Sequence, residues 1–394
     1  MEHNKSNCPH KAKYLSGKRI LPQPIDKNTD ITKLIDNLDA YNGGRMRAAC
    51  HLMRDRYSKE DVTVGLSLAG ALTPAGLGLS TIIPLMNHGF VDWIVATGAN
   101  MYHDIHYALN LPMFRGSHNV DDVDLRDKGI TRIYDILFDY EDVLMETDRR
   151  LREILVRPEF QKEMGTREFY YLLGKILSEL EQKNNLGQVS ILAAAYRNGI
   201  PVFTSSPGDS TIGMNVAGLE LLAEAKGLKD KFKLKINPSI DVNDSTAIVL
   251  NAKRYEKGKT GVILIGGGSP KNFVLQTEPQ IQEVLMIPEL GQDYDINITD
   301  ARPDTGGLSG ASPSEAASWG KIDPKQLEET VTAYLDVTLA FPILTAYTIQ
   351  NTNPKKQKRL YDRGEELRKK LIESYLENNK EVEQLKTLIN KLPV

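Results

Sequence analysis

The pattern of apolar and polar positions divides the chain into a helical start, a long region of alternating strands and helices, and a helical end. In the middle region, short apolar or β-branched runs alternate with stretches of helical periodicity. Runs without internal alternation are typical of strands buried on both faces of a parallel sheet. The runs that predict strands are VTVGLSL (62–68), VDWIVAT (91–97), IPVFTSS (200–206), TGVILIG (260–266) and INITDA (296–301).

Strands separated by helices predict an α/β fold, a doubly wound, mostly parallel, Rossmann-like sheet with helical N- and C-terminal extensions. Residues 61–353 would form this catalytic domain, and a region rich in helix formers at about 139–198 predicts a helical excursion from the sheet. Residues 354–394 place apolar side chains at helical spacing and predict a C-terminal helical extension.

The N-terminal part of the chain shows two different patterns. Residues 1–29 are polar and without period, which predicts a flexible arm. Residues 30–60 predict two helices, the first capped by Asp30 and the second beginning after Gly43 and Gly44. Three potential metal ligands lie close together in the arm, but a metal site normally needs four, so no metal is expected. These ligands are His3, Cys8 and His10.

Composition narrows the classes of function. The 394 residues are 41% hydrophobic and 26% charged with a net charge of −3, so the basic excess typical of nucleic-acid binding is missing. Two cysteines, Cys8 and Cys50, cannot form a disulfide framework, and a reducing cytoplasm is the expected compartment. The N-terminus does not have the pattern of a secretory signal, and the apolar runs are too short to span a bilayer. We expect neither nucleic-acid nor membrane partners.

Glycines follow several of the predicted strands. Gly266, Gly267 and Gly268 end the run GVILIGGG, and successive glycines let a backbone approach the pyrophosphate of a dinucleotide closely. A turn required only for close packing explains them equally well. Two further small-residue exits, SLAGALTPAGLG (67–78) and VATGAN (95–100), favour a nucleotide cleft at the carboxyl edge of the sheet.

Two aspartates also follow apolar runs. Asp209 stands after PVFTSS and Asp336 after AYL. A carboxylate at the end of a strand commonly binds a ribose hydroxyl, but either residue could equally cap the helix that follows, which near Asp209 begins at about Thr211.

The segment TGGLSGASPSEAASWGKI (305–322) carries the chemistry that stands out most. It combines a small-residue loop, a short helix bearing Glu315, and the sequence Trp319-Gly320-Lys321. A lone lysine is usually a solvated charge. Here Trp319 can offer its π-face to a cation and Glu315 an opposing carboxylate, which indicates a pocket for amines.

At this segment the chain resembles the deoxyhypusine synthase family, most closely its deoxyhypusine synthase-like branch. The loop SGA (309–311), Glu315 and SWGKI (318–322) reproduce the family's catalytic pattern. The triple glycine, the Asp209 loop and LDVTLAFP around Asp336 follow in family order. The resemblance implies a homotetramer with sites at subunit interfaces.

The resemblance also implies the roles of individual residues. Lys321 would carry an imine, Trp319 would pack on a polyamine and Glu315 would bind an amine, with Asn272 and His103 at further substrate positions. NAD is the implied cofactor, and small-molecule amines are the implied substrates. The residues implied to contact NAD are Thr73, Thr97, Gly98, Asp209, Gly266, Gly267, Gly268, Ser309 and Asp336.

The departures from the family pattern concentrate in the substrate pocket. Asn272 stands where the family has histidine, and Tyr102 and His103 stand where it has acidic residues. Leu308 and Met214 replace two aspartates. We therefore expect NAD-dependent aminoalkyl transfer through a lysine imine on a different amine. A true deoxyhypusine synthase, a homospermidine synthase-like enzyme, a plain NAD dehydrogenase and a non-catalytic NAD-binding protein are the alternatives.

Overall fold

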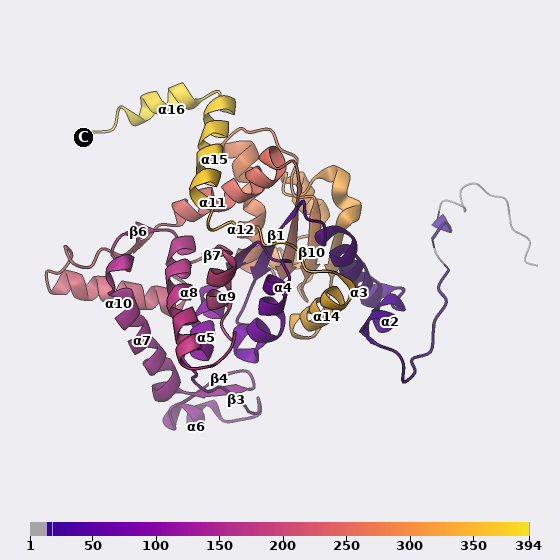
Figure 1. Cartoon of the computed structure of the whole chain (residues 1–394), viewed down its shortest axis with the longest axis horizontal. Helices are drawn as coiled ribbons and strands as arrows, with labels where there is room; N and C mark the ends of the chain where they lie inside the picture. Colours follow the sequence, from indigo (N-terminus) through magenta and orange to yellow (C-terminus); the bar gives the residue numbers. More distant parts are fainter. Residues whose placement is uncertain (1–13, 18, 394) are drawn as a thin grey trace, which may run out of the picture.

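A computed structural model describes residues 14–17 and 19–393 and shows the α/β architecture predicted from the sequence (Figure 1). Its centre is a six-stranded sheet in which every neighbouring pair of strands runs parallel. The strands are β1 (Val62–Leu68), β2 (Trp93–Ala96), β7 (Val202–Thr204), β9 (Lys259–Ile265), β10 (Tyr294–Ile298) and β11 (Thr330–Ala333).

The strand order makes the sheet doubly wound. Along the sheet the order is β11-β10-β9-β1-β2-β7, so the chain builds outward from β1 in one direction and then returns to build outward from β9 in the other. This is the Rossmann order, which confirms the predicted fold class. In such sheets ligands bind outside the carboxyl ends of the strands where the direction reverses, which here is between β1 and β9.

Both faces of the sheet are buried. On β9, Val262 and Leu264 belong to one apolar cluster, while Ile263 and Ile265 belong to another. This explains why the strand runs are apolar without alternation. The first cluster includes side chains of α11 (Pro238–Leu250), α12 (Gly268–Pro279) and α15 (Gly364–Asn378). The second includes side chains of α3 (Tyr41–Leu52), α4 (Ile83–Asn87), α5 (Gly98–Ala108), α8 (Thr166–Lys183), α9 (Ile191–Asn198) and α14 (Val337–Asn351).

The N-terminal helices confirm one expectation and correct another. Asp30 caps α2 (Ile31–Asp36), since its carboxylate accepts a hydrogen bond of 2.9 Å from the backbone N–H of Lys33. The prediction that the next helix begins after the two glycines is wrong, because α3 begins at Tyr41 and contains both. The Asn42 side chain donates to the carbonyl of Tyr334 at 2.7 Å and accepts from its N–H at 3.3 Å. These contacts hold the first turn of α3 despite the low helix propensity of glycine.

Five short strands outside the main sheet were not predicted from the sequence. β3 (Phe114–Arg115), β5 (Ile136–Asp139) and β4 (Ile130–Ile133) form an antiparallel sheet, and β6 (Glu163–Met164) pairs in parallel with β8 (Lys235–Ile236). Strands of two to four residues leave almost no pattern to recognise. The remaining helices near them are α6 (Asp122–Asp127), α7 (Glu146–Leu155) and α10 (Thr211–Ala225).

The two ends of the chain differ in how they pack. In α15, Leu367 and Leu371 are buried in the cluster that includes α11. The following α16 (Val382–Ile389) projects away from the body, with Ile389 exposed (Figure 1). Residues 19–29 form neither helix nor strand, and the suggested ligands His3, Cys8 and His10 lie outside the described residues.

The described part of the chain has neither a membrane-spanning helix nor a cluster of metal ligands. No helix in it is long and apolar enough to cross a membrane. Over residues 14–17 and 19–393, no group of three or more His, Cys, Asp or Glu side chains is arranged to hold a metal ion.

Candidate functional site

The carboxyl edge of the sheet brings together the predicted cofactor residues. Gly70 follows β1, and a Cβ atom added to it would meet no other atom within 4 Å. Gly268 follows β9, and a Cβ there would meet its nearest neighbours at 3.9 Å. The space beside Gly70 is therefore open, whereas a Cβ on Gly268 would be in ordinary van der Waals contact with Ala69 and Pro270. Glycines at this edge of the sheet would let a ligand approach the backbone closely.

The triple glycine makes a left-handed turn, with φ angles of 85°, 95° and 62° for Gly266, Gly267 and Gly268. A Cβ on Gly267 would lie 2.5 Å from the Cα of Ser309, so only glycine lets the two segments touch. The N–H of Gly266 donates to the carbonyl of Ile298 at 2.9 Å, and that of Gly268 donates to the hydroxyl of Ser309 at 2.9 Å. The turn therefore serves close packing, and two of its three amides already have protein acceptors.

The predicted cofactor residues after β1 and β2 hold loops together. The Thr97 hydroxyl donates to the carbonyl of Gly70 at 2.6 Å, and its oxygen caps α5. Gly98 packs so closely that a Cβ would lie 2.4 Å from the side chain of Ser210. Thr73 is 1% exposed and donates to the carbonyl of Asn100 at 2.8 Å. The Thr97 and Thr73 hydroxyls therefore connect the loop after β1 to the start of α5.

The two aspartates have different roles in the structure. The helix after β7 is capped by Ser210 and not by Asp209, whose exposed carboxylate makes no hydrogen bond or ion pair with any described residue. Asp336 does cap its helix, since its carboxylate accepts from the N–H groups of Thr338 and Leu339 at 2.9 and 3.2 Å. Asp209 is therefore free to meet a ligand hydroxyl, whereas Asp336 already has a structural role.

A cavity of about 290 Å³ opens beside Lys321. It gathers four residues that the sequence analysis singled out for substrate and catalysis, from α12, from α13 (Pro313–Ser318) and from the segment after it. These four are Asn272, Glu315, Trp319 and Lys321. The remaining lining residues are Lys271, Leu275, Gln276, Leu308, Ala311 and Ala316.

Within the cavity the Lys321 ammonium is held by neutral groups. Its Nζ donates to Oδ1 of Asn272 at 2.9 Å and lies 5.8 Å from the ring centre of Trp319. Burial lowers the pKa of Lys321, and the negative charges of Glu315 and Glu283 oppose that shift. A lysine that is half-buried, without a direct ion pair and with a lowered pKa, can supply a neutral amine more readily than a surface lysine.

The backbone that carries Lys321 is fixed on both sides. Its N–H donates to the carbonyl of Ala316 at 3.0 Å, and its carbonyl accepts from the N–H of Gln292 at 2.9 Å. Gly320 has a φ of 68°, and a Cβ there would lie 2.4 Å from the side chain of Gln282. The Gln282 amide donates to the carbonyl of Gly320 at 2.7 Å. Gln282 was not recognised in the sequence, because its partner lies 38 residues away along the chain.

Lys271 is a second lysine at this cavity that the sequence analysis missed. It is only 5% exposed, and its Nζ donates to the carbonyls of Ser309 at 3.3 Å and Ala311 at 2.8 Å. Burial lowers its pKa. Behind it lies the buried carboxyl of Asp295, whose pKa burial raises to about 7 while the charge of Lys271 opposes that rise. Lys271 thereby fixes the loop at 308–311.

His103 and Met214 do not line this cavity, although Leu308 does. His103 is 9% exposed and its ring contacts those of Tyr102, His106 and Phe138. Burial lowers its pKa to about 4, so the ring is neutral near pH 7. Within one chain, the structure therefore leaves His103 away from Lys321, because α5 turns this residue inward. Met214 is exposed on α10.

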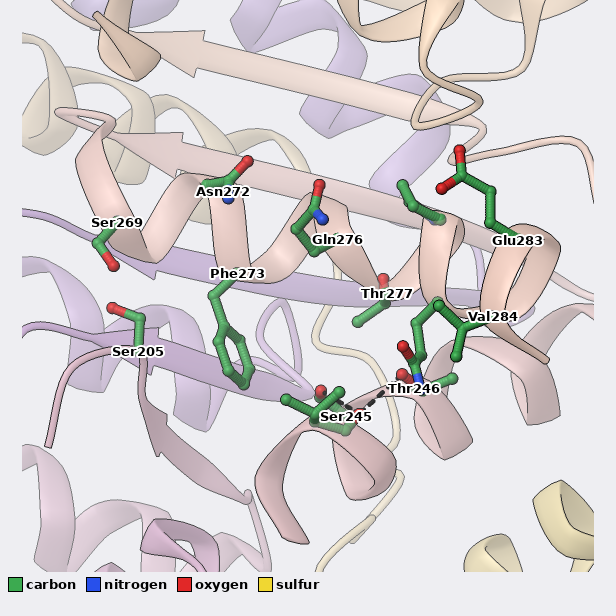
Figure 2. A pocket seen from close by; sticks show the side chains of 13 residues that line it. Ser205, Ser245, Thr246, Ser269, Asn272, Phe273, Gln276, Thr277, Glu283 and Val284 are labelled. Atoms are coloured by element: carbon green, nitrogen blue, oxygen red, sulfur yellow. Dashed lines mark hydrogen bonds between the residues drawn. The ribbon is translucent and has the colours of Figure 1, made fainter. Parts of the chain in front are cut away.

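A second cavity of about 360 Å³ lies beside the first (Figure 2). It runs between α11 and α12 and shares Asn272 and Gln276 with the Lys321 cavity. Its lining is mostly uncharged and polar. The lining residues are Ser205, Val242, Ser245, Thr246, Ser269, Asn272, Phe273, Gln276, Thr277, Pro279, Gln280, Glu283 and Val284.

Comparisons with known proteins agree with the residue pattern. The family model described as deoxyhypusine synthase matches residues 30–348. A "Deoxyhypusine synthase-like protein" of Nostoc sp. (strain PCC 7120) is 51% identical over 378 residues, which is 95% of this chain and 96% of the relative. A protein of Methanosarcina acetivorans named "Probable deoxyhypusine synthase 2" is 35% identical over 342 residues, which is 85% of this chain and 91% of the relative.

A solved structure is similar to this chain in its fold. It comes from Entamoeba histolytica, and its description names deoxyhypusine synthase. It superposes with a TM-score of 0.51 at 15% sequence identity, covering 86% of this chain and all of that one. At this identity the likeness concerns the fold and not the function.

Proposed function

The chain belongs to the deoxyhypusine synthase family, and from this premise we propose that it transfers an aminoalkyl group between amines through an imine on Lys321. The observation that carries the proposal is the position of Lys321. Its amine opens into a cavity beside Trp319 and Glu315, without an ion pair, and its pKa is lowered by burial. A solvated surface lysine would have neither the cavity nor the lowered pKa.

NAD is the cofactor we assign, and when bound it supplies the hydride acceptor and later the hydride donor, so that it is not consumed. The open space beside Gly70 gives it room, and the unpaired carboxylate of Asp209 offers an acceptor for a ribose hydroxyl. Ser309 and Thr97 fix the loops that border this space. Asp336 would contribute by holding the start of α14 rather than through a free carboxylate.

Lys321 has the covalent role. Its neutral amine attacks the imine carbon of the oxidised donor, and the amine on the other side of that carbon leaves as its C–N bond breaks. Lys321 then holds the aminoalkyl fragment as a Schiff base. An acceptor amine attacks the same carbon, the bond to Lys321 breaks, and the lysine returns to its free state. Asn272, which accepts a hydrogen bond from Nζ, orients the lysine throughout.

The pocket favours a donor or acceptor with fewer charges than spermidine. A buried ammonium needs a carboxylate, a carbonyl or an aromatic face. The Lys321 cavity offers one carboxylate, from Glu315, and one large aromatic face, from Trp319. Leu308 and Asn272 stand where the family pattern has charged or titratable groups. Transfer of the aminobutyl group of spermidine to a protein lysine, as in a true deoxyhypusine synthase, is the alternative.

We assign the protein to the cytoplasm and to a homotetramer whose sites lie at subunit interfaces. Trp319 is 60% exposed and Leu308 is 49% exposed, although both line the cavity. Apolar side chains exposed at a catalytic pocket are typical of a surface that another subunit covers. Residues 61–353 would form the catalytic domain of each subunit.

Borohydride trapping tests the proposal. The protein is incubated with NAD and each of a panel of polyamines, reduced, digested and analysed by mass spectrometry. We expect an aminoalkyl adduct on Lys321 that disappears in Lys321→Arg, because arginine keeps the charge but forms no Schiff base. The exposed Lys325→Arg serves as the matched control and should keep the adduct. Turnover by Lys321→Arg, or NAD-dependent oxidation without any adduct, would identify a plain dehydrogenase instead.

A further inference from the structure

The backbone of Lys321 is supported at two points, and the first is its own carbonyl. It accepts a hydrogen bond of 2.9 Å from the N–H of Gln292, which forms a short parallel bridge with Ile322. The carbonyl just before Gln292, that of Gly291, accepts a hydrogen bond from the Nζ of Lys253. A Cβ on Gly291 would lie 2.5 Å from the carbonyl carbon of Ile322, so the two segments pack closely. Lys253 therefore holds the segment that holds Lys321.

The second support is at Gly320, the residue before Lys321. The Nε2 of Gln282 donates to the Gly320 carbonyl at 2.7 Å and, in a longer hydrogen bond of 3.4 Å, to Oε2 of Glu278. The other oxygen of this carboxyl group, Oε1, is buried, makes no hydrogen bond with any described residue and lies 3.9 Å from the Nζ of Lys253. The same ammonium therefore lies against the carboxyl group that contacts Gln282.

Three acidic side chains surround Lys253, which lies in the π-helical segment Asn251–Tyr255 after α11. Besides Glu278, Glu289 lies 2.9 Å and Asp293 3.8 Å from its Nζ, and only 10% of the side chain is exposed. Burial lowers the pKa of Lys253, but the charges of the three acidic groups outweigh burial and raise it, so the ammonium stays charged near pH 7.

This cluster is difficult to explain by stability alone. Glu278 is fully buried, and burial raises its pKa to about 8 although the charge of Lys253 opposes the rise. Burying several charges together costs free energy that their attraction often does not recover, so such clusters are weak evidence for stability. Fixing one conformation of the backbone at Lys321 gives the cluster a role.

We infer that Lys253 is a positioning residue for Lys321, which it reaches through both supports without lining the cavity. The inference rests on the proposed function and deepens it. An amine must approach an imine carbon from a narrow range of directions, and a displacement of about 1 Å can slow a reaction about a hundredfold. The Lys321 amine makes one side-chain hydrogen bond, to Asn272, so its direction depends on where its backbone is held.

The test measures how fast Lys321 is captured in the full-length protein, supplied with NAD and the polyamine of the panel that gives the wild type most adduct. Borohydride added after increasing times, followed by mass spectrometry, gives this rate. Calorimetry gives the affinity for NAD and the number of NAD sites per chain. We expect Lys253→Met to lower the rate about 10- to 100-fold while both NAD values stay unchanged. Lys253→Arg keeps the charge and should restore most of the rate.

Two further variants sharpen the test. Gln282→Met breaks only the second support and leaves no buried charge unpaired, so it should lower the rate about three- to tenfold and does not depend on whether Lys253→Met folds. Lys259→Met is the matched control, because Lys259 also pairs with Asp293, at 2.7 Å, but makes no contact with either support. It should match the wild-type rate.

Hydrogen exchange gives a measurement that does not need the reaction. The N–H of Gln292 donates to the Lys321 carbonyl, so it should exchange faster in Lys253→Met and not in Lys259→Met. Equal exchange at Gln292 in Lys253→Met and the wild type would contradict the inference.

The remaining outcomes separate this inference from the proposed function. An unchanged rate in Lys253→Met, or in Gln282→Met if Lys253→Met does not fold, overturns the inference alone, since the wild-type adduct on Lys321 still supports the proposed function. A loss of NAD sites in proportion to the loss of rate overturns it as well, because Lys253 would then support only the fold. The absence of any wild-type adduct with every polyamine removes both.

Discussion

The two sides of the Lys321 cavity differ in how tightly they are held. On one side, Lys271, Gly267 and Gly268 clamp Ser309, through hydrogen bonds to its carbonyl and hydroxyl and through a contact that only glycine permits. On the other side, Lys321 makes a single side-chain hydrogen bond, to Asn272, and Trp319 is largely exposed. The first side is therefore rigid, and the second leaves the amine of Lys321 accessible to a ligand.

Two lysines show what this difference means chemically. Burial lowers the pKa of both Lys271 and Lys321. The amine of Lys271 donates to two backbone carbonyls and is nearly inaccessible, so it cannot attack a substrate. The amine of Lys321 borders the cavity and can attack a substrate. A lowered pKa alone therefore does not identify the nucleophile, because the number of hydrogen bonds and the access to the amine decide between the two.

The largest expected difference is between the stabilities of two lysine variants, one on each side of the cavity. Lys271→Met should lower the free energy of unfolding by about 3 kcal/mol, because it leaves two part-buried carbonyls without their donor and removes the positive charge that acts on the buried Asp295. Lys321→Met should cost less than about 1 kcal/mol, since only its bond to Asn272 is lost. Urea denaturation followed by circular dichroism measures both. Equal losses would show that the two sides are held alike.

A smaller difference should separate two adjacent glycines. Gly267→Ala should cost about 2–4 kcal/mol, since its φ of 95° and ψ of −130° are nearly restricted to glycine and the new Cβ would meet Ser309. Gly268→Ala has a φ of 62° and ordinary contacts at 3.9 Å, so it should cost about 1–2 kcal/mol. Thermal unfolding of the two variants gives the comparison. The opposite order would mean that the Ser309 contact is not tight.

The smallest effect should appear on the open side, as a shift in pH dependence. Glu315 raises the pKa of Lys321 against burial, so Glu315→Gln should lower that pKa. An amine reacts when it has lost its proton, so the rise in labelling of Lys321 by an amine-reactive reagent should move to lower pH. Mass spectrometry at Lys321 across a pH series measures the shift, with Glu328→Gln as the control. A shift to higher pH would contradict the assigned sign, and stability should change little because Glu315 is exposed.

Much of the fold could be predicted because the main strands are buried on both faces. An apolar run such as that of β9 is recognisable without knowledge of its neighbours. β11 was not identified as a strand, because TVTA is short and half polar. The exact start of α3 depends on hydrogen bonds between Asn42 and Tyr334, almost three hundred residues apart, and no local pattern contains that information.

The candidate site could be predicted in part, namely where its residues lie close together in the sequence. Glu315, Trp319 and Lys321 lie within seven residues, so their proximity could be inferred from the sequence. The role of Lys271 could not, because its acceptors are carbonyls 38 and 40 residues away. His103 was placed by analogy of position after a strand, but α5 is buried on most sides, including the side that bears this residue.

The π-helical segment Gln280–Val284 follows α12 and contributes residues to the cavity between α11 and α12. The lining of this cavity therefore depends on the number of residues in the segment. A π-helical turn contains an extra residue relative to an α-helical one, and such turns are often found at functional sites. Deleting one residue from Gln280–Val284 would turn everything after it by about 100° around the axis, given 3.6 residues per turn. When the deleted residue precedes Glu283, that carboxylate would leave the cavity without being substituted. Insertions and deletions here, and not only exchanges of one residue for another, are therefore a route by which evolution can change the charge that lines this cavity.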